Sequence, residues 1–301
     1  MFGSGYLTLI AGIAMAQGLS DRMAATIERL IYRGTVVPSR VSSESLPEIL
    51  QTKARTWDHR GGVLLASLIA GIYGVWNGPL ETALAIIAGY VVGRVVGRMV
   101  CYGFLGRFLR GEGARVIMQP GHPDGAAGLK PLGDFYFSQA MLLAIPIAFL
   151  AVWTLLIPVW PYHDYSHWRA PYLTLLVVGL VLEMGAFFLP MWTIHQDMVK
   201  EKARLQAEAD ELGRQIVGLR AKLTGIADAE ARSALKDQVE LLSRQYEELE
   251  HVPTWPVDRS TGRRFTVSNL AMFIPVAVQI IGATGPWRQI AEVMERFLSQ
   301  P

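Results

Sequence analysis

Four long apolar runs alternate with polar segments along this chain. They cover about Gly62–Leu80, Thr82–Leu105, Gln139–Trp160 and Tyr172–Ile194. Each run is close to the roughly 20 residues that a helix needs to cross about 30 Å of hydrocarbon. Because only a helix satisfies its own backbone hydrogen bonds within lipid, the pattern predicts four transmembrane helices.

A polar segment follows the fourth run near Met198, and its apolar residues keep a heptad spacing. They recur at alternating steps of four and three from Leu205 to Ile226, and again from Leu235 to Leu249. Such a spacing is the seam of packed helices, and two of these helices with a short connection predict an antiparallel hairpin. The seam can pack within one subunit, or it can serve self-association or a partner helix. We expect the fourth run and the first hairpin helix to be one continuous helix.

The predicted fold is therefore all-α: a polytopic membrane protein with four transmembrane helices and a cytoplasmic coiled-coil-like helical hairpin. We divide it into four parts: an N-terminal cytoplasmic or interfacial helical region 1–60, a transmembrane domain 61–197 with a loop 106–138, the hairpin 198–252, and C-terminal membrane-contacting and amphipathic helices 253–301.

Two shorter apolar stretches lie outside the four runs. Tyr6–Ala16 is compatible with a short interfacial or re-entrant helix and equally with a buried helix. Val267–Gly282 contains Pro275 and is short for a span, so a re-entrant or membrane-surface helix fits it best and a fifth span is the alternative. The tail Trp287–Leu298 has amphipathic spacing.

Basic residues set the predicted orientation. Lys and Arg gather before the first run, between the second and third runs, and after the fourth run, whereas the other two loops contain only Arg169. Loops rich in Lys and Arg stay in the cytoplasm, which places the N-terminal region, the loop 106–138 and the hairpin there. Composition agrees with a membrane protein, since 51% of residues are hydrophobic and 18% are charged, against about a quarter charged in soluble domains.

The second run contains the candidate packing and pore residues. Gly89, Gly93 and Gly97 recur every four residues and allow close approach of another helix, including one from a second subunit. Arg94 and Arg98 lie one turn apart on the same helix, and Arg94 has nearly the same predicted depth as Glu183 in the fourth run, which allows an ion pair. These charges are compatible with a structural salt bridge, with an ion pathway lined or gated by them, or with binding of lipid headgroups.

The loop 106–138 contains a tight turn, His122-Pro123-Asp124-Gly125-Ala126-Ala127-Gly128-Leu129. No second histidine cluster and no nucleophile lie near His122 and Asp124 in the sequence. The chain also lacks nucleotide-binding, zinc-binding and Ser-His-Asp patterns, and its single cysteine, Cys101, excludes an intrachain disulfide and a cysteine-based metal site. We therefore predict no enzyme activity, no cofactor and no metal.

At this turn the chain resembles a group of bacterial multi-pass membrane proteins that carry H-P-D-x-A-G-G-L on the cytoplasmic side and a W-P-x-D-like element before a C-terminal apolar segment. Here the turn includes His122, Pro123, Asp124 and Gly128, Ala127 stands where the group usually has glycine, and the second element is Trp255-Pro256-Val257-Asp258. The resemblance implies a location in the bacterial inner membrane.

A further likeness, without a diagnostic residue, is to the channel effector of Hailong-type anti-phage defence. It implies an oligomeric ion channel held shut by a nucleotide or oligonucleotide signal.

The leading functional hypothesis from the sequence is an oligomeric membrane ion channel gated from the cytoplasm, with Arg94, Arg98 and Glu183 as pore or gating candidates. Its partners would be the lipid bilayer, further copies of the chain and an acidic ligand such as an oligonucleotide. The alternative is a membrane-anchored scaffold or sensor that presents its hairpin to a soluble partner. A lipid- or envelope-related factor is the third hypothesis.

Overall fold

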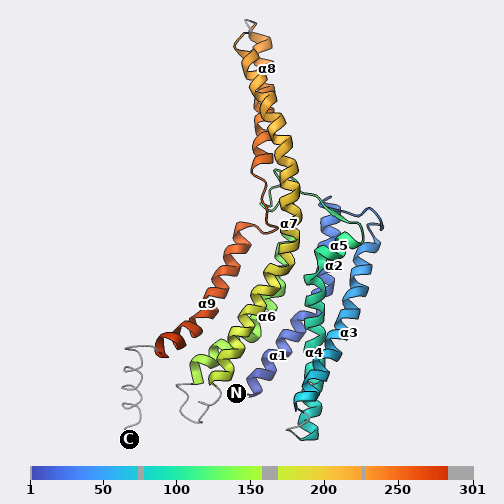
Figure 1. Ribbon diagram of the computed structural model, residues 1–301, viewed down its shortest axis with the longest axis vertical. Coiled ribbons are helices and arrows are strands. Elements are labelled where there is room, and N and C mark those ends of the chain that lie inside the picture. The colour runs from blue at the N-terminus through green and yellow to red at the C-terminus, as the bar shows by residue number, and fades with distance from the viewer. Residues whose placement is uncertain (1, 74–77, 158–168, 226–227, 284–301) are drawn as a thin grey trace. The chain divides into compact units, whose positions relative to one another are not determined.

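The computed structural model describes residues 2–73, 78–157, 169–225 and 228–283, and most of these are helical (Figure 1). The only strands in these ranges are β1 (Val36–Val37) and β2 (Arg115–Val116), which pair antiparallel. The predicted all-α class is confirmed. The predicted amphipathic tail Trp287–Leu298 lies outside the described residues.

The chain forms two compact units, each built from separate stretches of sequence. One unit contains Met1–Leu19, Phe137–Phe187 and Ser260–Pro301, and the other contains Ser20–Tyr136 and Phe188–Arg259. The described helices, in chain order, are α1 (Phe2–Gln17), α2 (Leu19–Tyr32), α3 (Ser45–Tyr73), α4 (Pro79–Gly103), α5 (Leu105–Gly111), α6 (Lys130–Leu156), α7 (Arg169–Leu223), α8 (Ala229–Glu250) and α9 (Arg259–Ala283).

Three described helices are long and apolar enough to cross a membrane, over Thr82–Gly103, Lys130–Leu156 and Ala170–Leu223. They correspond to the second, third and fourth apolar runs. The boundary between the first two runs differs from the prediction, because Leu80 belongs to α4 rather than to the preceding helix. Pro79 begins α4, where its fixed φ suits the first turn and its missing N–H costs no hydrogen bond.

Helix α7 runs without a break for 55 residues, from Arg169 to Leu223. At 1.5 Å per residue it is roughly 80 Å long. The predicted continuity between the fourth apolar run and the polar heptad segment is confirmed. Pro190 lies inside this helix, and the hydroxyl of Thr193 donates a hydrogen bond to the Pro190 carbonyl at 2.9 Å.

Helix α8 packs along the C-terminal part of α7 within the same chain (Figure 1). Near the base of the pair, Lys202 Nζ donates a hydrogen bond to the carbonyl of Val252 at 3.0 Å. Further along, Gly213 faces the ring of Tyr246. The buried residues of this seam are at predicted heptad positions: Leu205, Ala209, Ile216 and Val239. Asp228 caps α8 by accepting a hydrogen bond from the backbone of Glu230 at 3.2 Å.

The glycine stripe of α4 packs against α3. A Cβ on Gly93 would overlap the carbonyl of Gly61, and a Cβ on Gly97 would overlap the carbonyl of Trp57. Gly89 faces the side chain of Ile69 in the same way. The stripe therefore allows close helix approach, as predicted, but it is occupied by α3 of the same chain. The predicted contact of this stripe with a second subunit stays a prediction, and α3 of the same chain covers that face.

Candidate functional site

Asp58 is the centre of a charged cluster between α3 and α4. Arg98 Nε donates a hydrogen bond to Asp58 Oδ1 at 2.9 Å, and a second guanidinium nitrogen of Arg98 donates to Asp58 Oδ2. Arg94 Nη2 lies 3.9 Å from Asp58 Oδ2. The side chain of Asp58 is 5% exposed, that of Arg98 16% and that of Arg94 51%. The two-pronged Arg98 contact is the strong form of this interaction, and the glycine crossing holds the two helices close enough to form it.

The contacts of Asp58 differ between the two arginines that the sequence analysis considered as pore residues, Arg94 and Arg98. Arg98 is neutralised inside its own unit, so its charge does not require a water-filled pathway. Arg94 is half exposed and is the more available of the two cations. Asp58 was missed by the sequence analysis, although it stands one turn before the first apolar run, where a carboxylate has a reason to meet a basic residue of the next helix.

Glu183 has a different environment. Its side chain is fully buried, and Asn269 Nδ2 donates a hydrogen bond to its Oε1 at 3.4 Å. Glu183 and Arg94 belong to different compact units, and the predicted ion pair between them stays a prediction. The structure gives each of them a polar partner in its own unit.

The turn at His122–Leu129 is organised around the carboxylate of Asp124. Its Oδ1 accepts hydrogen bonds from the backbone N–H groups of Ala126 and Gly128, each at 3.0 Å. His122 Nδ1 lies 3.0 Å from the same oxygen, and Arg33 Nη1 lies 3.3 Å from Oδ2. The turn is thereby fastened to the residue that follows α2. The predicted tight, shaped turn is present, and Asp124 is its acceptor.

Backbone conformation explains the small residues of this turn. Gly121, Gly125 and Gly128 all have positive φ, and a Cβ at Gly128 would overlap the side chain of Thr35. Ala127 has a φ of 53° and is the only non-glycine residue in the described chain with a positive φ. Left-handed backbone costs a non-glycine residue about 1–2 kcal/mol. Glycine would adopt this left-handed conformation without that strain.

We expect Ala127→Gly to stabilise the protein by about 1 kcal/mol, because it removes the strain of the left-handed conformation at the cost of one buried methyl group. Ala126→Gly is the matched control, since Ala126 is also buried but has no positive φ, and it should destabilise. Chemical denaturation of both variants measures the difference. Equal losses of unfolding free energy in the two variants would contradict the expectation that the backbone of Ala127 is strained.

The environment of Asp124 also predicts a pH dependence. Burial acts to raise the pKa of its carboxyl, but hydrogen bonds from the backbone of Gly128 and Ala126, with the contact to His122, outweigh burial and lower that pKa below its ordinary value. A lowered folded-state pKa contributes stability above the ordinary pKa of about 4, and this contribution is lost as the pH falls toward the folded-state pKa.

We therefore expect Asp124→Asn to lower the melting temperature at neutral pH, and the deficit to shrink as the pH falls below about 4. The control is Asp237→Asn on the exposed side of α8, which should match the wild type throughout. Melting curves of both variants, measured between pH 3 and 8 at steps of about one pH unit, give the comparison. A deficit in Asp124→Asn that grows toward low pH would disprove the role of the carboxylate.

The second element, Trp255-Pro256-Val257-Asp258, lies against the turn and the start of α6. Lys130 Nζ is 3.1 Å from Asp258 Oδ2, and a Cβ at Gly133 would overlap the carbonyl of Pro256. The indole of Trp255 stacks on the imidazole of His195 in α7, with ring centroids 4.3 Å apart. The two elements that carry the sequence resemblance, more than 120 residues apart, therefore form one structural junction.

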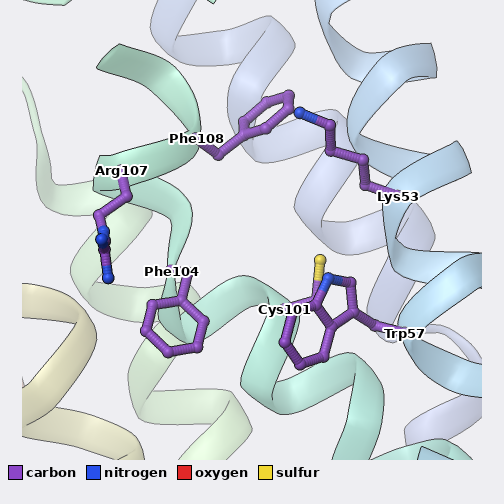
Figure 2. A pocket seen from close by; sticks show the side chains of 6 residues that line it. All are labelled: Lys53, Trp57, Cys101, Phe104, Arg107 and Phe108. Carbon is purple, nitrogen blue, oxygen red and sulfur yellow. The ribbon is translucent and has the colours of Figure 1, made fainter. Parts of the chain in front are cut away.

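A shallow pocket of about 430 Å³ lies between α3, α4 and α5. Figure 2 shows its lining of three aromatic rings, two cationic side chains and the thiol of Cys101: Lys53, Trp57, Cys101, Phe104, Arg107 and Phe108. Lys53 Nζ is 4.3 Å from the centroid of the Phe108 ring, and the same nitrogen pairs with Glu112 at 2.9 Å. One of the two cations is thus already neutralised, and the pocket has no arranged set of reactive groups.

The described residues offer no group of three or more His, Cys, Asp or Glu side chains that could hold a metal ion. His122 and Asp124 contact each other, and Asp124 accepts the backbone hydrogen bonds that hold the turn. No family model, no curated protein and no solved structure matches the chain.

Proposed function

We propose that this chain is a membrane-anchored sensor or scaffold whose helical hairpin binds a soluble partner and is mechanically connected to its membrane helices. The observation that carries the proposal is the single helix α7, which continues from an apolar segment able to cross a membrane into a polar hairpin. In this proposal four helices cross the bacterial inner membrane, the first being the C-terminal part of α3, and the hairpin is cytoplasmic.

The base of the hairpin is connected to the Asp124 turn and to α6. Gly121 lies against the carboxyl group of Glu248 at the end of α8. His195 Nδ1 donates a hydrogen bond to the carbonyl of Thr254 at 2.7 Å, and the Lys130–Asp258 pair joins the following residues to the first turn of α6. Movement of α8 would therefore displace the turn and α6, which supports a transmitting role.

The hairpin also has apolar side chains that its own seam does not use. Val217 on α7 is 68% exposed and Leu241 on α8 is 58% exposed. Single exposed apolar residues are common on protein surfaces, but these two occur on the hairpin parts of α7 and α8, whose other exposed residues are mostly polar. They are the positions from which a partner helix would gain most by burial.

A photoreactive amino acid placed at Val217 or Leu241 tests the partner directly. Irradiation of living cells should crosslink these positions to a soluble protein, whereas the same probe at Glu211, an exposed polar site on α7, should give much less product. Crosslinking only to a second copy of the chain would reject the soluble partner and favour self-association. Absence of any product at both apolar positions would also reject the proposal.

An oligomeric ion channel is the second candidate, and the half-exposed Arg94 favours it. A pore would form between subunits, and the exposed apolar residues of α4, such as Leu84 and Ile87, are available to neighbouring copies because the glycine face is not. In reconstituted bilayers, Arg94→Gln should lower the ratio of anion to cation permeability, and Arg107→Gln should lower it less. This candidate would be excluded if the full chain does not conduct and a variant with its hairpin truncated does not conduct either.

A further inference from the structure

Helices α7 and α9 pack in opposite directions within one compact unit, and their contacts form successive layers. The rings of Phe187 and Phe265 stack with centroids 4.0 Å apart. Four residues further on each helix, toward the apolar end, Glu183 meets Asn269. The next layers are aliphatic: Leu180 and Leu176 pack with Met272 and Val276. A carboxyl and a carboxamide thus occupy a single polar layer between aromatic and aliphatic layers.

In the described chain, two acceptor atoms of this polar layer lack a hydrogen-bond donor. The amide nitrogen of Asn269 donates to Glu183 Oε1 at 3.4 Å and to the carbonyl of Phe265 at 3.1 Å, which uses both of its hydrogens. Glu183 Oε2 and Asn269 Oδ1 are both buried without a hydrogen-bond donor in the described chain. The side chains are almost fully buried, Glu183 at 0% and Asn269 at 5% exposure.

In the described part of this unit, no cation neutralises the carboxyl. Apart from Glu183, the charged residues in the described part of this unit are Arg169, Arg263 and Arg264. Arg169 is about 21 Å away along α7, and Arg263 and Arg264 are exposed on α9. Tyr172 is three turns away on α7, and the described part of α6 in this unit has no charged residue. An unpaired carboxylate in such a layer is strongly unfavourable.

We infer that Glu183 is a proton-binding site: its carboxyl is neutral in the folded protein, and Oε2–H donates a hydrogen bond to Asn269 Oδ1. One proton then satisfies both atoms that lack a donor, and the two side chains join α7 to α9 through reciprocal hydrogen bonds. Release of the proton to water leaves a carboxylate facing an amide oxygen, so that α9 is held less firmly. The site would respond to pH independently of any partner at the hairpin.

Infrared spectroscopy of protein labelled with ¹³C-glutamate, in lipid nanodiscs, tests the protonation itself. At neutral pH the wild type should show the carbonyl band of a protonated glutamic acid, because exposed glutamates are ionised there. Asn269→Leu should shift the frequency of this band, since it removes the acceptor. A wild-type spectrum without the band would overturn the inference, and this measurement needs no variant.

Glu183→Gln tests the consequence for stability, since glutamine keeps the shape and can donate to Asn269 Oδ1. Above the ordinary pKa of glutamate, the unfolding equilibrium of the wild type should shift toward the unfolded state by up to tenfold for each pH unit, because folding must take up a proton. Glu183→Gln should remove this component, whereas Glu208→Gln at an exposed site of α7 should retain it. A Glu183→Gln variant with the full wild-type pH slope, or stabilisation of the wild type by Na⁺ but not by choline, would overturn the proton site in favour of an ionised or cation-bound carboxylate.

Discussion

Asp58→Ala should destabilise the protein by about 3–5 kcal/mol, because it leaves the guanidinium of Arg98 in a largely buried position without its partner. Arg98 donates two hydrogen bonds to the carboxylate of Asp58, and its side chain is only 16% exposed. Arg94, at 51% exposure, can turn toward solvent or headgroups and should lose little. Equilibrium unfolding in mixed micelles measures the loss.

Two comparisons make this result specific to the buried pair. Glu112→Ala removes the exposed Lys53–Glu112 pair and should cost at most about 1 kcal/mol. The double substitution Asp58→Leu with Arg98→Met replaces both charges by apolar groups and should recover most of the loss. An Asp58→Ala variant as stable as Glu112→Ala would show that the pair contributes nothing.

Hydrophobic periodicity was sufficient to predict the helical class, the three candidate spans and the continuity of α7, because each depends on local sequence. A run of apolar residues fixes where a helix can cross lipid, and the absence of Gly or Pro near Met198 predicts that α7 continues. Periodicity does not tell which neighbour covers a face. The glycines of α4 therefore predicted a close contact correctly, but not that Gly61 of α3 provides it.

The charged and polar contacts were less predictable, because they depend on pairing between helices that are distant in sequence. Glu183 and Arg94 matched in depth, yet depth does not distinguish among helices, and Asn269 was not considered because an uncharged amide carries no signal in a charge pattern. The turn was recognised from its small residues. Its connection to Trp255–Asp258 follows only from the packing of α7, α8 and α6 around it.

The crossing of α3 and α4 is the feature that a single large side chain should disrupt most. A Cβ at Gly93 would overlap the Gly61 carbonyl and would lie 2.9 Å from the Cβ of Leu65. Backbone cannot yield as a flexible side chain does, so Gly93→Leu must push the helices apart. This separation would also pull Arg98 away from Asp58, and the two losses add. We expect a cost of at least about 3 kcal/mol, the upper part of the range for overpacking.

Gly103→Leu is the matched control, because Gly103 is on the same helix and has no neighbouring atom within 4 Å of an added Cβ. Leucine favours helix over glycine by up to about 1 kcal/mol, so this variant should be neutral or slightly more stable. Native mass spectrometry, together with the unfolding measurement, then distinguishes a glycine contact within one chain from a glycine contact between subunits. If the stripe joins α3 to α4 within one chain, Gly93→Leu lowers the unfolding free energy of the chain whatever its assembly state. A variant that keeps wild-type stability and loses only its oligomeric state would instead place Gly93 between subunits.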